Sequence, residues 1–121
     1  MRSATFPALF AAALLAAAPF GAPAARAATV APAEAGHYAG RKITVEGVAN
    51  VTTTRSGVVF VDLGGVGRGA PFTGFIAKEN AARFPDVGRY SGKTVDITGT
   101  VQTFRGRPEI VLTDPGQIAV K

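Results

Sequence analysis

The sequence predicts an all-β fold, a five-stranded barrel with one short helix between strands three and four. Three observations point to it. Apolar and polar residues alternate with a period of two through most of residues 40–121, as in strands with one buried face. The one helix-compatible stretch, Lys78 to Phe84, falls between the third and fourth expected strands. Two long strands carry a mid-strand glycine, which allows the bend that a small barrel requires.

The first 27 residues have the three parts of a secretory signal peptide. Met1-Arg2 is a basic start, and Ala8 to Phe20 is an uncharged apolar run. Ala25-Arg26-Ala27 then has small residues at the two positions that a signal peptidase recognises before its cleavage site. The apolar run of ~13 residues is shorter than the ~20 that a transmembrane helix needs. We therefore expect cleavage after about Ala27, no transmembrane segment after processing, and a periplasmic or secreted product.

Residues 28–39 consist mostly of Ala, Pro and Gly without a period, so we expect a flexible lead-in to one domain over residues 40–121. His37, the single histidine, lies in this segment, where a solvated side chain is expected. The formal charge of +5 becomes smaller once Arg2 and Arg26 leave with the signal peptide. A mildly basic domain allows weak attraction to polyanions without demanding it.

The expected strands are separated by clear turn signals. Arg55-Ser56-Gly57 and Arg105-Gly106 read as tight turns, Gly64 to Pro71 as a glycine-rich loop, and Pro85 ends the short helix. The expected strands cover residues 42–51, 58–63, 72–77, 95–102 and 109–113, with Ile118 to Val120 as an extension of the last.

Two segments of similar sequence support a closed barrel. Gly40 to Gly47 and Gly92 to Gly99 each run from a glycine and a basic residue through an alternating strand to a second glycine. Two copies are too few for a repeat array, so we interpret them as two long strands that curve at Gly47 and Gly99. Three strands, a short helix and two strands is the order of the oligonucleotide/oligosaccharide-binding (OB) fold.

The stretch from Gly92 to Ile118 resembles the last two strands of bacterial exported OB-fold domains of the nucleic-acid-binding-like family. The matching features are Gly92-Lys93, Gly99, Arg105-Gly106-Arg107-Pro108-Glu109-Ile110, Asp114-Pro115 and Gln117-Ile118, and upstream Val45-Glu46-Gly47, Phe60, Leu63-Gly64-Gly65 and Phe84-Pro85-Asp86. More distantly, the chain resembles the exported bacterial OB-fold family linked to stress tolerance. The resemblance implies the fold over about Gly40 to Lys121. Such domains occur in nucleases, in binding proteins and as lone exported modules, so it implies no single activity.

Four arginines are candidate ligand-binding residues. Ligands of this fold lie across strands two and three, between the loop joining strands one and two and the loop joining strands four and five. These loops hold Arg55 and the pair Arg105 and Arg107, and Arg68 lies at the tip of the glycine-rich loop. Guanidinium groups bind phosphates and carboxylates and stack on bases. Arginines at hairpin turns are, however, usually just solvated, and this interpretation stays open.

Two phenylalanines are candidate stacking surfaces, Phe60 and Phe104. Stacking of a base on an exposed ring is worth about 1–3 kcal/mol. A phenylalanine is more often part of a core. Phe60 lies on the strand face opposite Val59, Val61 and Leu63, and the sequence leaves open which of these faces points outward.

The composition speaks against most catalytic chemistry. The absence of cysteine excludes disulfides, thiolate metal sites and catalytic thiols, and one histidine excludes a histidine-cluster metal site. Gly65 to Ala70 matches the dinucleotide pattern G-x-G-x-x-A, but Pro71 and a strand follow where a helix is required. The acidic residues form no tight cluster. We predict no catalytic residue, no metal site and no cofactor.

Two functions therefore follow as hypotheses. The first is an exported, non-enzymatic OB-fold binding module whose ligand is single-stranded nucleic acid or another anionic oligomer. The alternative is a periplasmic protein-interaction or structural accessory domain that binds an envelope protein and no nucleic acid.

Overall fold

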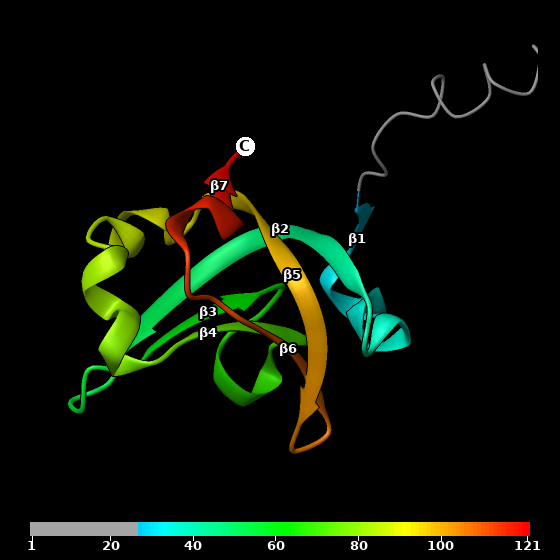
Figure 1. Cartoon of the computed structure of the whole chain (residues 1–121), viewed down its shortest axis with the longest axis horizontal. Coiled ribbons are helices and arrows are strands. Elements are labelled where there is room, and N and C mark those ends of the chain that lie inside the picture. The colour runs from blue at the N-terminus through cyan, green and yellow to red at the C-terminus, as the bar shows by residue number, and fades with distance from the viewer. Residues whose placement is uncertain (1–26) are drawn as a thin grey trace, which may run out of the picture.

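The computed structural model describes residues 27–121 and contains seven strands (Figure 1). They are β1 (Ala28–Val30), β2 (Lys42–Thr53), β3 (Val59–Leu63), β4 (Phe72–Ile76), β5 (Thr94–Phe104), β6 (Arg107–Val111) and β7 (Ile118–Val120). The predicted signal peptide lies outside the described residues, apart from Ala27. None of the helices in the described part is long and apolar enough to cross a membrane.

Five of the strands close into a barrel. β2 pairs antiparallel with β3 through its second half and with β5 through its first half. β3 pairs antiparallel with β4, β4 pairs parallel with β6, and β6 pairs antiparallel with β5, which completes the ring. The two additional strands, β1 and β7, extend the sheet beside β2 and β5. The predicted five-stranded, all-β OB fold is confirmed.

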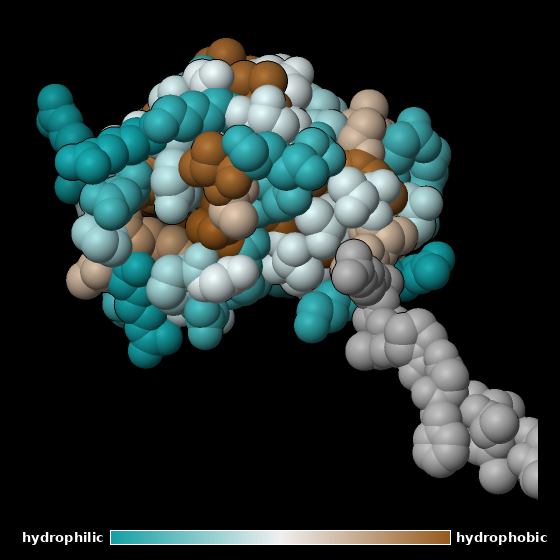
Figure 2. Space-filling view, turned by 90° about the horizontal axis from the view of Figure 1, so that it is seen from above, coloured by the Kyte–Doolittle hydropathy of each residue, from teal (hydrophilic) through white to brown (hydrophobic). Residues whose placement is uncertain are grey.

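The barrel interior is filled by the inward residues of every strand. β2 and β5 contain the two segments of similar sequence and bury equivalent positions of them. These are Ile43 and Val45 in β2, and Val95 and Ile97 in β5. The largest fully buried side chains are Phe72, Ile43, Leu63, Ile76, Ile97, Ile110 and Leu112. On the face seen in Figure 2, apolar side chains form small patches separated by hydrophilic ones.

The mid-strand glycines make room for neighbouring side chains. A Cβ atom on Gly99 would lie 2.6 Å from Cγ2 of Ile110, and one on Gly47 would lie 2.7 Å from Cγ of Pro32 and 3.3 Å from Cβ of Leu63. Contacts this short force a shift of the neighbour. Both glycines therefore mark places where a strand of the barrel passes close to another buried group.

The segment before the barrel, predicted as a flexible lead-in, contains a short strand and a 3₁₀ helix. β1 pairs in parallel with residues 43–45, and a 3₁₀ helix spans Pro32–Tyr38. Ala35 is 0% exposed, and Val30 and Tyr38 pack against the core. Single buried residues such as Ala35 produce no regular alternation of apolar and polar residues, so the sequence gives no sign of these contacts. His37 is exposed, with its Nδ1 3.2 Å from a carboxylate oxygen of Glu34.

The expected short helix lies in the predicted place but has 3₁₀ geometry. One 3₁₀ helix covers Lys78–Arg83 and a second covers Val87–Tyr90, and both precede β5. Phe84 and Val87 are buried where this connection packs on the barrel core. Pro85 supplies no backbone N–H, so the two short helices cannot merge into one regular α-helix.

Candidate functional site

A groove runs over the outer face of the barrel between three connections: the β2–β3 turn, the β3–β4 loop and the β5–β6 turn. It consists of two adjoining hollows of about 520 and 410 Å³ that share four lining residues. We call it the aromatic groove and define it by Phe60, Arg68, Phe75, Phe104, Arg105, Arg107 and Glu109, with Thr54, Ser56 and Val58 at one end. The three connections lie on the lower side of the barrel in Figure 1.

The floor of the aromatic groove is made by phenylalanine rings. Phe60 on β3 and Phe75 on β4 are directly opposite each other in the sheet. Their ring centroids are 5.8 Å apart with the planes inclined by 54°, and both side chains are half-buried. Phe104, at the end of β5, is 56% exposed. Val59, Val61 and Leu63 fill the barrel interior, so Phe60 faces outward, which settles the choice that the sequence left open.

A buried carboxylate anchors the β3–β4 loop beside this floor. Asp62 is 3% exposed; its Oδ2 accepts a 2.9 Å hydrogen bond from the amide of Gly67, and its Oδ1 accepts a 2.8 Å bond from the hydroxyl of Thr73. From the other side, Nη1 of Arg107 donates to the carbonyl oxygens of Gly67 and Ala70, over 2.7 and 3.4 Å. The loop is thus tied at both sides, which fixes the base from which Arg68 projects.

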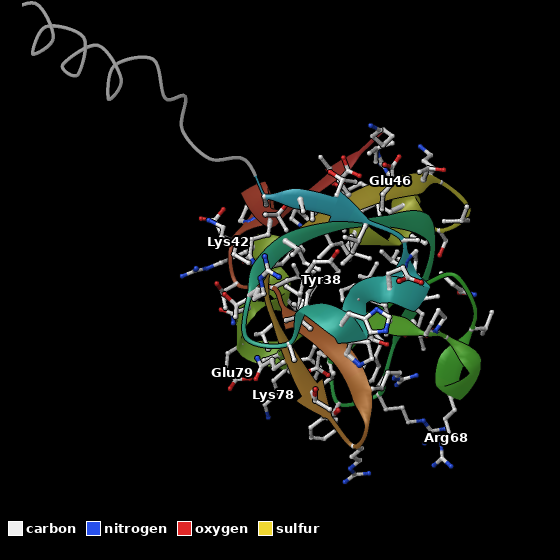
Figure 3. All side chains as sticks on the ribbon, turned by 90° about the vertical axis from the view of Figure 1, so that its right-hand side faces the viewer. Tyr38, Lys42, Glu46, Arg68, Lys78 and Glu79 are labelled. Carbon is white, nitrogen blue, oxygen red and sulfur yellow. The ribbon has the colours of Figure 1, made fainter. Side chains whose placement is uncertain are left out.

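The predicted arginines occupy different positions around the groove. Arg68 points outward at the tip of the β3–β4 loop (Figure 3), and Arg105 lies at the β5–β6 turn with its guanidinium carbon 5.2 Å from the centre of the Phe104 ring. Arg107 is the loop anchor described above. Arg55 is exposed at the β2–β3 turn between two lining residues but does not itself line either hollow. Of the six predicted binding residues, five line the groove and Arg55 flanks it.

Besides Thr54, Ser56 and Val58 at one end, two groove residues were missed from the sequence. Phe75 and Glu109 lie on the outward faces of β4 and β6, and strand alternation relative to Phe72 and Ile110 carries that information. Glu109 is half-buried in the groove. Burial raises the pKa of its carboxyl, and the nearby Arg107 guanidinium acts in the opposite direction.

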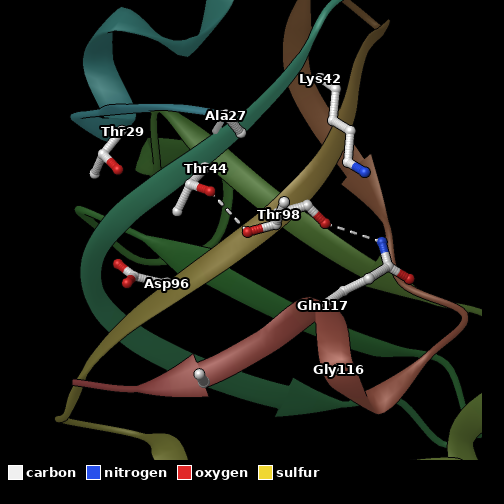
Figure 4. Close-up of a pocket in the computed structure, with 9 residues that line it drawn as sticks. Ala27, Thr29, Lys42, Thr44, Asp96, Thr98, Gly116 and Gln117 are labelled. Atoms are coloured by element: carbon white, nitrogen blue, oxygen red, sulfur yellow. Dashed lines mark hydrogen bonds between the residues drawn. The ribbon is translucent and has the colours of Figure 1, made fainter. Parts of the chain in front are cut away.

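A second hollow of about 660 Å³ lies over strands β2 and β5, between β1 and β7 (Figure 4). The hydroxyls of Thr44 and Thr98 bond to each other over 2.7 Å. The side-chain amide of Gln117 donates to the carbonyls of Thr98 and Val111. The side chains of Thr44, Thr98 and Gln117 are therefore already paired within the protein, whereas the buried Oδ1 of Asp96, which also lines this hollow, has no hydrogen-bond partner among the described residues.

Comparisons with known proteins find likeness in structure. The chain is similar to a protein provisionally named aspartyl-tRNA synthetase from Leishmania major Friedlin, with a TM-score of 0.53 and 12% identity over 92% of this chain and 26% of that one. It is also similar to an aspartyl tRNA synthetase from Entamoeba histolytica, with a TM-score of 0.45 and 21% identity over 69% of this chain and 19% of that one. The likeness to the Leishmania protein is one of fold alone.

The match to these enzymes is partial. The chain spans about a quarter of the length of the first synthetase and about a fifth of the second. No family model matches the sequence, and no curated protein matches it.

Proposed function

We propose that this chain is a non-enzymatic OB-fold binding module whose aromatic groove takes single-stranded nucleic acid. The observation that carries the proposal is the combination of three outward-facing phenylalanine rings with three arginines around one groove. The synthetase neighbour is named for an enzyme that acts on tRNA, but at 12% identity that likeness supports the fold only. The case for nucleic acid comes from the groove.

The rings supply a surface for stacking. Every base has a π-face, so exposed aromatic side chains bind single strands with little dependence on sequence, at about 1–3 kcal/mol per base. The rings of Phe60 and Phe75 lie side by side across two neighbouring strands, with their planes inclined by 54°, and Phe104 lines the same groove. Aromatic rings on an outer face can take unstacked bases but offer nothing to a duplex whose bases are stacked inside.

The arginines supply the contacts to phosphate. Arg68 and Arg105 are exposed at the tips of two different loops, and both line the same hollow. Arg105 already stacks on Phe104, so its guanidinium is held over the groove rather than swinging freely. Arg55 extends the line of positive charge past the β2–β3 turn. A strand lying across the floor would therefore meet cations from the loops that border it.

Binding of this kind depends on salt, and the dependence tests the proposal. We would titrate a fluorescein-labelled oligo(dT) with the protein at two salt concentrations and follow the anisotropy. The slope of log affinity against log salt is about −0.7 per phosphate contact for single strands. The double variant Arg68→Ala/Arg105→Ala should lower the affinity at low salt and make this slope shallower by about 1.4.

The control variant is Arg89→Ala/Lys93→Ala, which removes the same charge from exposed positions outside the groove. It should change the affinity and the slope much less. The proposal is wrong if the protein does not bind the oligonucleotide at low salt, or if the control pair costs as much affinity as the groove pair.

We also propose that the module is exported. Cleavage after about Ala27 would leave β1, which begins at Ala28, intact beside β2. Expression of the full chain in a bacterium, followed by fractionation and intact-mass measurement, tests this. A periplasmic chain that begins near Ala28 supports export, and a full-length cytoplasmic chain refutes it.

A further inference from the structure

One groove residue has no part in the binding of phosphate or in stacking. Glu109 is the only carboxylate that lines the aromatic groove among the described residues. It lies on β6 between Thr73 of β4 and Gln102 of β5, and it borders both hollows. No hydrogen bond and no ion pair within 4 Å joins its carboxylate to another described residue.

A carboxylate in this position works against a ligand that is bound by its phosphates alone. An ionised carboxylate accepts hydrogen bonds and donates none, and it repels phosphate. Half-buried between Phe75 and Phe104, it also bears a desolvation cost that an unpaired polar group does not recover. A ligand that brings hydrogen-bond donors to the floor of the groove would recover that cost.

We propose that Glu109 selects guanine within a bound single strand. The two carboxylate oxygens would accept hydrogen bonds from N1–H and from the N2 amino group of a guanine whose ring stacks on the groove phenylalanines. Unstacked bases in single strands are read at their Watson–Crick edges in this way. The inference rests on the proposed function of the groove and names the base that it prefers.

The donor pattern of the four bases singles out guanine. Its Watson–Crick edge presents two adjacent donors, which match the two oxygens of a carboxylate. Adenine and cytosine present one amino group beside a ring nitrogen acceptor, and thymine or uracil presents one N–H between two carbonyls. With each of these bases, a lone pair of the base would face the carboxylate, and at least one hydrogen bond would be lost.

The loop anchors keep the neighbouring groups from competing for Glu109. The hydroxyl of Thr73 donates to Asp62, and Arg107 donates to the carbonyl oxygens of the β3–β4 loop. The Arg105 guanidinium lies over Phe104. The carboxylate is therefore left as the acceptor that a base can reach.

The test uses oligo(dT) with one central substitution, which avoids guanine quadruplexes. Affinities for strands carrying a single dG, dA, dC or deoxyinosine are compared in the wild type, in Glu109→Gln and in the control Glu79→Gln, whose side chain is exposed outside the groove. We expect the wild type to bind the dG strand roughly tenfold or more tightly than the dA strand. Deoxyinosine, which lacks the N2 amino group, should fall between them.

In Glu109→Gln the preference for dG should disappear, and binding to plain oligo(dT) should increase, because a repulsive charge is gone. Glu79→Gln should keep the preference. Equal affinity of the wild type for all strands, or a dG preference that survives Glu109→Gln, overturns the inference and leaves the proposed function standing. If no strand binds at all, the proposed function fails and this inference fails with it.

Discussion

The carboxylate of Asp62 accepts a 2.9 Å hydrogen bond from the backbone amide of Gly67, and this bond fixes the loop that carries Arg68. The other oxygen of Asp62 accepts from Thr73, so both oxygens of a buried side chain are used. Asp62 therefore occupies an outward position on β3 but is buried and holds the β3–β4 loop in place. One edge of the aromatic groove depends on this contact.

Replacing Asp62 by Asn should therefore destabilise the fold. The amide nitrogen of Asn would face one of the two donors, and a buried donor left without an acceptor costs about 1–3 kcal/mol. Urea unfolding of Asp62→Asn measures this cost. Asp86→Asn is the control, because Asp86 is exposed and makes no capping bond with its side chain, so the change should stay within about 0.5 kcal/mol. Equal stability of the two variants would show that the anchor contributes nothing.

Arg105 lies in a backbone conformation that suits other residues better. Its φ is 53°, and the following Gly106 has a φ of 80°, in a two-residue turn between β5 and β6. Such turns favour Asn at the first position, since a residue with a longer side chain is strained there. We expect Arg105→Asn to raise the free energy of unfolding by about 0.5–1 kcal/mol and at the same time to weaken oligonucleotide binding. A variant that gains stability without losing affinity would show that Arg105 is not part of the binding surface.

Gly99 should tolerate no side chain, because a Cβ atom there would lie 2.6 Å from Ile110. Gly99→Val is expected to lower the free energy of unfolding by about 1–3 kcal/mol, seen as a drop of several degrees in the melting temperature. Gly88→Ala serves as the comparison, since a Cβ atom on Gly88 would have nothing within 4 Å. If both variants melt at the same temperature, β5 does not pass as close to β6 as described.

Glu109 should make stability depend on pH. Burial raises the pKa of its carboxyl above the usual 4.5, against the opposing effect of Arg107, so the folded protein holds this proton more tightly than the unfolded chain does. Its protonation stabilises the fold at pH values below 4.5, and that contribution is lost as the pH rises through the folded-state pKa. The guanidinium groups that border the groove, those of Arg68, Arg105 and Arg107, stay charged throughout this range.

Glu109→Gln should therefore melt at a higher temperature than the wild type at ~pH 7, with a smaller difference at ~pH 4. Thermal unfolding at the two pH values measures this, with Glu79→Gln as the reference for an exposed carboxyl. A difference of the same size at both pH values would contradict a raised pKa.

The barrel could be predicted from the sequence because its strands carry their own signals. The inward residues of β2 and β5 alternate with polar ones, and Gly47 and Gly99 interrupt them at the same point of each strand. The order of turns and strands then fixed the topology. The role of the glycines was harder to see, since the close contact with Ile110 depends on a strand that follows later in the chain.

The site was only partly predictable, for physical reasons. Turn residues such as Arg55, Arg68 and Arg105 are visible because turns have clear sequence signals. Phe75 and Glu109 were missed because their importance depends on strand pairing: Phe75 lies opposite Phe60 across β3 and β4, and Glu109 comes beside β4 through the parallel pairing of β4 with β6. The strand and the 3₁₀ helix within residues 28–38 were not predicted either, since single contacts such as that of Ala35 leave no pattern.

The most direct test of the aromatic groove is a titration of the ¹⁵N-labelled protein with oligo(dT), followed through the amide resonances in two-dimensional NMR spectra. We predict that the shifts concentrate on Phe60, Phe75, Phe104 and Arg105, while the amides around Thr44 and Thr98 in the second hollow stay in place. Shifts that concentrate on Thr44 and Thr98, or no shifts at low salt, would contradict the assignment of the groove as the nucleic-acid site.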